Sequence, residues 1–154
     1  MKPRVVVVDD SPICRALLGD WLQADGDLEV VGEAADGEAA IDAITHLRPD
    51  VATVDLRMPG MSGLDLISYL MAKAPLPILV LTGDPTSHDP LVAFEAVRRG
   101  ALDLMLKPSE VDDDAIRSLR ARVRWLATVL QMDGRRIDQL ELTKLGRRGD
   151  NTDG

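Results

Sequence analysis

The sequence has a single cysteine, a deficit of positive charge and no long apolar run. Because Cys14 stands alone, an internal disulfide is excluded; we expect an inert thiol within the first helix, in a reducing compartment. A formal net charge of −8 argues against nonspecific nucleic-acid binding. The N-terminal apolar run is too short for a signal peptide, and no stretch approaches a membrane span. These absences predict a soluble cytoplasmic protein that binds neither nucleic acid nor a membrane.

Polar side chains follow four short apolar runs, each at the point where the run ends. Runs that are rich in β-branched residues and do not alternate are typical of parallel strands buried on both faces. The carboxyl ends of such strands share one edge of an open α/β sheet, and ligands bind outside that edge. We therefore expect one rim to carry Asp9, Asp10, Asp55, Thr82 and Lys107.

Three of these residues are acids, and three carboxylates at one point need a cation. Asp9, Asp10 and Asp55 would repel one another unless a positive charge lay among them. Ligand sets made only of oxygen suit Mg²⁺. The pattern therefore predicts a magnesium site at this rim.

Strand and helix patterns alternate along the chain, which predicts a parallel sheet with helices on both faces. We expect strands at about 4–9, 29–35 and 102–106, and a fourth helix at about 90–99 that ends at Gly100. Ser11 and Ser62 are suited to cap the first and third helices. Apolar spacing predicts the buried faces of these two helices, with Ile13, Leu17 and Trp21 in the first and Leu64, Ile67 and Met71 in the third.

The chain is long enough for one domain and a tail. We expect the domain at 1–133, with its last helix at about 112–133, and a tail at 134–154 that is partly helical and then disordered. Apolar residues in the last helix resemble a heptad seam that continues past Gly134, so they fit either packing on the sheet or pairing with a second chain. A basic face on the same helix suits an acidic partner or simple solvation; its residues are Arg117, Arg120, Arg122 and Arg124.

Segments of the chain resemble, in order, the motifs of response-regulator receiver domains from bacterial two-component signalling. They are V-V-V-V-D-D-S, V-D-L-R-M-P-G-M-S-G, L-V-L-T-G and G-A-L-D-L-M-L-K-P, and the resemblance covers about residues 3–133. It implies a flavodoxin-like, doubly wound sheet of five parallel strands in the order 2-1-3-4-5, flanked by five helices, the last of them extended. Gly63-Leu64-Asp65 and Lys107-Pro108-Ser109 resemble a narrower group, the receivers of chemotaxis protein-glutamate methylesterases.

The resemblance implies a role for each acid at the rim. Asp55 would be the phosphoacceptor, whose carboxylate takes a phosphoryl group from a histidine kinase. Asp9 and Asp10 would hold Mg²⁺ together with Asp55 and the backbone carbonyl of Arg57.

It also implies roles for the neighbouring polar residues. Thr82 and Lys107 would contact phosphoryl oxygens, and Gly83 would leave room for them. The Lys107–Pro108 bond is a candidate cis peptide. The signal would pass to a downstream protein or to a second copy of the chain, through the fourth helix, fifth strand and fifth helix.

One position departs from the family pattern. Receivers usually carry an aromatic residue three before the lysine, whose ring moves with the threonine when the domain is phosphorylated. This position is Leu104, which has no ring and no hydrogen-bonding group, so the usual switch of Thr82 with an aromatic is in doubt. Arg57 and Asp84 lie where the family tunes dephosphorylation, and an ion pair between them is a hypothesis.

The sequence supplies no methylesterase, since it contains no G-x-S-x-G motif and continues only briefly past the last expected helix. We therefore expect no enzyme beyond self-catalysed phosphorylation and dephosphorylation, in a stand-alone receiver or a fragment. A receiver that acts only as a scaffold is the first alternative, favoured by Leu104. A phosphatase of the haloacid dehalogenase type is less favoured, because its second aspartate would stand where this chain has Arg57.

Overall fold

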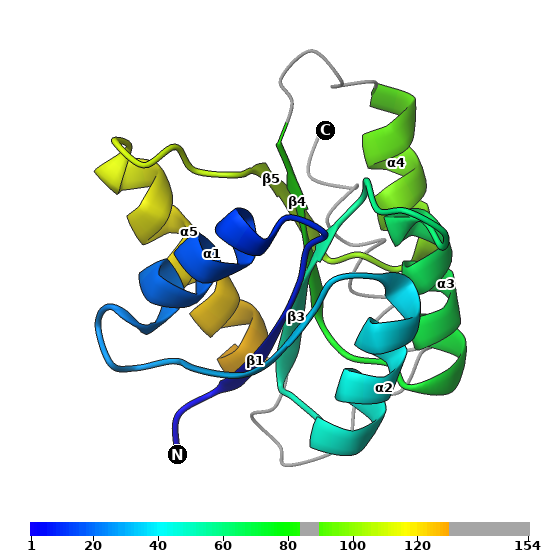
Figure 1. The fold of residues 1–154 in the computed structure, drawn as a ribbon, viewed down its shortest axis with the longest axis horizontal. Coiled ribbons are helices and arrows are strands. Elements are labelled where there is room, and N and C mark those ends of the chain that lie inside the picture. The colour runs from blue at the N-terminus through cyan, green and yellow to red at the C-terminus, as the bar shows by residue number, and fades with distance from the viewer. Residues whose placement is uncertain (84–89, 130–154) are drawn as a thin grey trace, which may run out of the picture.

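The structure, a computed structural model, describes residues 1–83 and 90–129. Within these residues, five strands and five helices alternate strictly, and Figure 1 shows their arrangement. They are β1 Arg4–Val8, α1 Pro12–Gln23, β2 Glu29–Ala34, α2 Gly37–Leu47, β3 Val51–Asp55, α3 Gly63–Lys73, β4 Ile78–Thr82, α4 Pro90–Arg99, β5 Asp103–Leu106 and α5 Asp113–Val129. The predicted end of the last helix and the tail at 134–154 lie outside the described residues. Over the ranges that are described, no helix is long and apolar enough to cross a membrane.

The five strands form one parallel sheet in the order β2-β1-β3-β4-β5, which confirms the predicted fold. The helices α1 and α5 cover one face, and α2, α3 and α4 cover the other (Figure 1). Because β1, β3 and β4 lie inside the sheet, both of their faces are buried, which is why their sequences are apolar without alternation.

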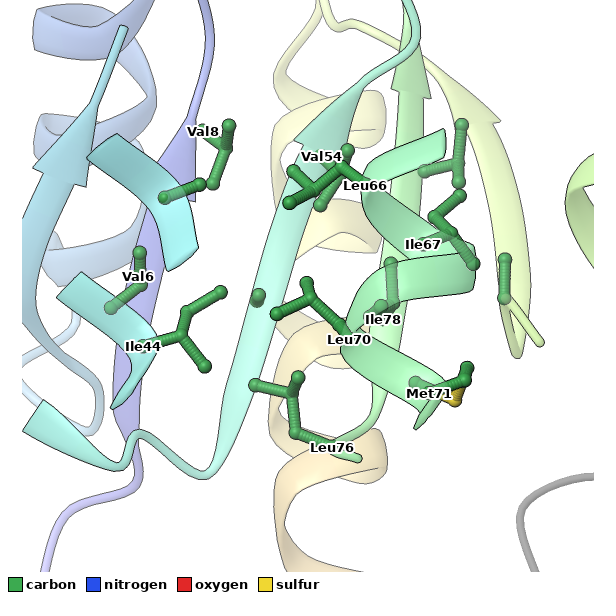
Figure 2. Packing of buried hydrophobic residues seen from close by; sticks show 14 of the residues in the cluster. Val6, Val8, Ile44, Val54, Leu66, Ile67, Leu70, Met71, Leu76 and Ile78 are labelled. Atoms are coloured by element: carbon green, nitrogen blue, oxygen red, sulfur yellow. The ribbon is translucent and has the colours of Figure 1, made fainter. Parts of the chain in front are cut away.

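Successive residues of each strand contribute to opposite layers of the core. Val6, Val8 and Val54 point into the layer under α2 and α3, where they pack with Leu66, Leu70 and other side chains shown in Figure 2. Val5, Val7 and Leu79 belong to the second layer, under α1 and α5. The run of valines in β1 therefore supplies two methyl-rich side chains to each layer.

Side chains cap the helices that lead away from the sheet. The Ser11 hydroxyl accepts from the Cys14 N–H, and the Ser62 hydroxyl accepts from the Asp65 N–H, as predicted. The Asp36 carboxylate caps α2 in the same way. Gly100 follows α4 with φ of 128°, a conformation that favours glycine, which agrees with its predicted place after the fourth helix.

The buried face of α1 differs from the prediction. Leu18 and Leu22 are buried in the second core layer, whereas Ile13 is 72% exposed and Trp21 only packs along the edge of the core. The spacing of Ile13, Leu17 and Trp21 fits a helix face, but the neighbouring face carries the two leucines, and the strand-to-helix turn directs that face to the sheet. Cys14, expected to be an inert thiol, is only half-buried within α1.

The basic face of α5 is paired within the molecule rather than free for an acidic partner. Arg120 Nε lies 3.1 Å from Asp25 Oδ2, and Arg122 Nη1 lies 3.0 Å from Asp103 Oδ2. Arg124 pairs with Asp27, and Arg117 pairs with Asp114 in the first turn of the same helix. These contacts tie α5 to the α1–β2 loop and to β5, which explains the basic face without a partner.

Candidate functional site

Asp9, Asp55 and Lys107 meet at the carboxyl edge of the sheet. Lys107 Nζ lies 2.6 Å from Asp9 Oδ2 and 3.2 Å from Asp55 Oδ2. The side chains are 16%, 1% and 9% exposed for Lys107, Asp9 and Asp55. The ends of β1, β3 and β5 supply these three groups, so residues far apart in the sequence form a buried ion triad.

Backbone N–H groups orient both buried carboxylates. The Ser11 N–H donates to Asp9 Oδ1 over 2.9 Å, and the Arg57 N–H donates to Asp55 Oδ1 over 3.1 Å. Each acceptor lies two residues before its donor, so each turn folds back on the carboxylate that ends its strand. The second oxygen of each carboxylate is thereby left to face Lys107.

Burial dominates the electrostatics of Asp55. It disfavours the charged carboxylate and raises the pKa of Asp55 above its ordinary 3.8; the charge of Asp9 adds to this, while the Arg57 N–H and Lys107 oppose it. Burial also disfavours the charged form of Lys107, but its hydrogen bond to Asp9 and the charges of Asp55 and Asp9 outweigh burial and raise the pKa of Lys107. Lys107 therefore stays charged in this site, whereas the folded state favours the protonated form of Asp55.

A pH dependence of stability follows from the raised pKa of Asp55. The contribution of this group to stability is complete below pH 3.8, its ordinary pKa, and is lost as the pH rises through the higher native pKa. We expect Asp55→Asn to avoid this loss and to raise the Tm at pH 7 in EDTA. The difference from wild type should shrink as the pH falls towards 4. The exposed Asp42→Asn serves as control and should show no such trend; a gap that stays constant with pH would contradict the assignment.

Thr82 and Gly83 lie at the end of β4, on the same edge. Thr82 Oγ1 is buried and has no hydrogen-bond partner among the described residues, so a polar group aimed at this edge is unsatisfied. A Cβ on Gly83 would lie 3.6 Å from Lys107 Cδ and 3.8 Å from Lys107 Nζ. An alanine would therefore fit in ordinary contact, but it would fill the space beside the lysine.

Gly63 lets the start of α3 approach the strand that carries Asp55. Its N–H donates to the Leu56 carbonyl over 3.0 Å, and a Cβ here would lie 2.5 Å from the Asp55 carbonyl oxygen. In the sequence, Gly63 is only one residue of the segment that resembles methylesterase receivers. Its packing role becomes clear only from the distances in the folded protein. Only glycine permits this contact, which closes the loop after Asp55.

The acids fit a divalent cation. Asp9, Asp10 and Asp55 each offer an oxygen, and these oxygens lie within 4.8 Å of one another. Around an octahedral Mg²⁺, neighbouring oxygens are about 2.9 Å apart and opposite ones about 4.1 Å, so the three oxygens must come closer together to bind the ion. Asp10 is exposed and can make that movement, whereas Asp9 and Asp55 are held. The donor set and its spacing thus suit a magnesium ion.

The structure contradicts the predicted cis peptide bond at Lys107–Pro108 and does not describe the predicted pair of Arg57 with Asp84. The Lys107–Pro108 bond is trans, so the predicted cis peptide was wrong; trans is the lower-energy form of most X–Pro bonds. Asp84, the hypothetical partner of Arg57, lies outside the described residues. Leu104 is half-buried and packs against the core layer under α3 and α4.

Comparison with known proteins agrees with this geometry. The model of the response regulator receiver domain matches residues 5–119. A protein-glutamate methylesterase/protein-glutamine glutaminase from Anaeromyxobacter dehalogenans is 45% identical over 128 residues, which is 82% of this chain and 37% of that protein. One from Pyrococcus abyssi is 36% identical over 151 residues, covering 93% of this chain and 40% of that protein. The chain thus spans about two-fifths of the length of these curated relatives.

A solved structure gives the same result. The response regulator domain of Thermotoga maritima CheB superimposes with a TM-score of 0.75 at 33% identity, over 82% of this chain and 97% of that chain. Both the general resemblance and the narrower likeness to methylesterase receivers are thereby confirmed. The chain belongs to the family of response regulator receiver domains.

Proposed function

We propose that this chain is a phosphoacceptor receiver that takes a phosphoryl group onto Asp55 and signals by a change of conformation. One observation carries the proposal: Lys107 bridges Asp9 and Asp55 at the edge where the buried Thr82 hydroxyl has no hydrogen-bond partner among the described residues. A phosphoryl group on Asp55 would bring anionic oxygens to this edge, where an ammonium and an unsatisfied hydroxyl can contact them.

The residues divide the work of the transfer. An Asp55 oxygen attacks the phosphorus, a new P–O bond forms, and the bond from phosphorus to the donor breaks. The Arg57 N–H fixes the other Asp55 oxygen, which leaves one oxygen free to react. Lys107 moves from Asp55 towards the phosphoryl oxygens, Thr82 donates its hydroxyl to another, and Gly83 leaves room for the group.

Asp9, Asp10 and Asp55 would hold Mg²⁺, with the backbone carbonyl of Arg57 as a further ligand. Bound there, the ion offsets the charge of the acids and of the phosphoryl oxygens. Asp9 contributes as a fixed ligand, since Ser11 and Lys107 both hold its carboxylate.

We also propose the partners. The donor would be a histidine kinase, in the cytoplasm. A setting in chemotaxis is supported by a similar solved structure that is named a chemotaxis response regulator. The output surface would be α4, β5 and α5, acting on a downstream protein or a second copy of the chain. This surface carries exposed apolar side chains, namely Leu91, Phe94, Leu106 and Trp125. Since Leu104 has no ring, the coupling from Thr82 to this surface would run through packing rather than an aromatic rotation.

Intact mass measurement tests the proposal. After incubation with Mg²⁺ and acetyl phosphate, we expect wild type to gain one phosphoryl group and Asp55→Asn to gain none. EDTA should abolish the gain in wild type. A folded wild type that gains nothing in the presence of Mg²⁺ would contradict the proposal and favour the scaffold alternative.

A further inference from the structure

Arg15 contacts the acidic site from the first turns of α1. Its Nη1 donates to the backbone carbonyl of Asp9 over 2.7 Å, in a partly buried position. Its own N–H donates to the Ser11 carbonyl over 3.0 Å. Arg15 is therefore hydrogen-bonded to both ends of the turn from Asp9 to Ser11, through its side chain at Asp9 and through its backbone N–H at Ser11. This turn carries two of the three acids.

The position of this arginine is electrostatically unusual. A cation near a helix N-terminus opposes the helix dipole, and α2, α3 and α5 instead have acids in their first turns. The first turn of α1 has no acid, and Arg15 is the fourth residue of the helix. A residue that is unfavourable for its own helix but bonded to the turn beside it is better explained by the turn than by the helix.

Asp10 is the acid that needs this support. Asp9 is held at its N–H by the Ala34 carbonyl and at its carboxylate by Ser11 and Lys107. Within the described ranges, no hydrogen bond or ion pair holds the exposed Asp10 carboxylate. The backbone of the turn therefore sets the direction of the Asp10 carboxylate. The carbonyl that accepts from Arg15 belongs to the peptide that joins Asp9 to Asp10.

We propose that Arg15 is a positioning residue of the cation site: its guanidinium fixes the Asp9–Asp10 peptide and so aims the Asp10 carboxylate at the metal. The inference rests on the proposed function, because it assumes that these acids bind Mg²⁺. Arg15 itself touches neither the metal nor the phosphoryl group. It acts in the way that outer partners of metal ligands act, by fixing a ligand that would otherwise turn.

The direction in which Mg²⁺ affinity changes when Arg15 is replaced distinguishes a positioning role from a purely electrostatic one. Arg15→Met keeps the apolar stem but removes both the donor and a positive charge near three acids. If only the charge mattered, Mg²⁺ would bind more tightly to this variant. If Arg15 positions Asp10, Mg²⁺ should bind about tenfold more weakly, as found for lost outer partners of metal ligands.

Isothermal titration with Mg²⁺ tests this in the full chain, with acetyl phosphate labelling of wild type in parallel. We expect weaker binding for Arg15→Met and recovery of most of the affinity for Arg15→Lys, which can still donate to the carbonyl. The matched control is Arg120→Met, because Arg120 also donates to a backbone carbonyl, that of Trp21, but far from the acids. It should lower the Tm and leave the Mg²⁺ affinity unchanged.

The outcomes distinguish the two proposals. If wild type binds Mg²⁺ and is labelled, but Arg15→Met binds as tightly or more tightly, the role of Arg15 is overturned and the proposed function stands. If wild type binds no Mg²⁺, both are overturned. Should Arg15→Met fail to fold, the same comparison uses Arg15→Leu, which also lacks a donor, and an affinity equal to that of wild type would overturn the inference.

Discussion

Gly63→Ala is expected to lower the free energy of unfolding by about 2–4 kcal/mol, although alanine normally favours a helix over glycine. The new Cβ would lie 2.5 Å from the Asp55 carbonyl oxygen and 2.6 Å from Leu56 Cα. Both are backbone atoms of the segment that carries Asp55, so no flexible side chain can move aside. The helix α3 must shift, which breaks the bond from the Gly63 N–H to the Leu56 carbonyl. Denaturant unfolding measures the loss.

The same substitution at Gly19 is the matched control. Gly19 lies inside α1, and the nearest atom to a new Cβ would be Glu33 Oε1 at 3.8 Å, an ordinary contact. Gly19→Ala should therefore stabilise the protein by about 0.5–1 kcal/mol. Equal effects at the two glycines, or a stabilised Gly63→Ala, would show that the close approach at α3 does not constrain the loop.

Lys107→Met should have opposite effects on stability and on metal affinity. Without metal, it leaves the buried Asp9 and Asp55 carboxylates without their cation, and we expect a loss of about 2–4 kcal/mol in EDTA. Since Lys107 lies between two of the acids proposed to bind the metal, its removal should also tighten Mg²⁺ binding by at least about tenfold. Saturating Mg²⁺ should therefore restore much of the lost stability.

Unfolding in EDTA and in Mg²⁺, with isothermal titration, gives both quantities. Lys73→Met makes the same change at an exposed lysine in the last turn of α3 and should alter neither by much. If Lys107→Met is as stable as wild type in EDTA, the ion triad contributes nothing to the fold. If it binds Mg²⁺ more weakly, the lysine helps to build the cation site rather than competing with it.

The sheet was predictable because its signals are local. The apolar runs of β1, β3 and β4 each end at a polar residue, and a ligand crevice at the carboxyl ends of parallel strands follows from topology alone. Ser11 and Ser62 identify helix starts by their chemistry. These patterns predict that Asp9, Asp55 and Lys107 lie at one edge of the sheet, as the structure shows.

What the sequence did not reveal depends on contacts between distant residues. The exposed Ile13 and the buried Leu18 both fit a helical spacing, and only the crossing of α1 over the sheet selects between them. From the sequence, the arginines of α5 form a basic face without evident partners, because the acids that pair with them, such as Asp25 and Asp103, lie on other elements. The hydrogen bond from Arg15 to the Asp9 carbonyl could not be predicted from the sequence either, since an arginine in a helix usually faces solvent.

The division of the core has a consequence for how the protein tolerates change. The sheet separates the layer of Val6 and Leu70 from that of Val5 and Leu119, so residues on opposite sides share few neighbours. Defects in the two layers should then combine additively, whereas defects within one layer should be coupled. Either layer can therefore drift in sequence almost independently of the other, provided that the strands between them keep their register.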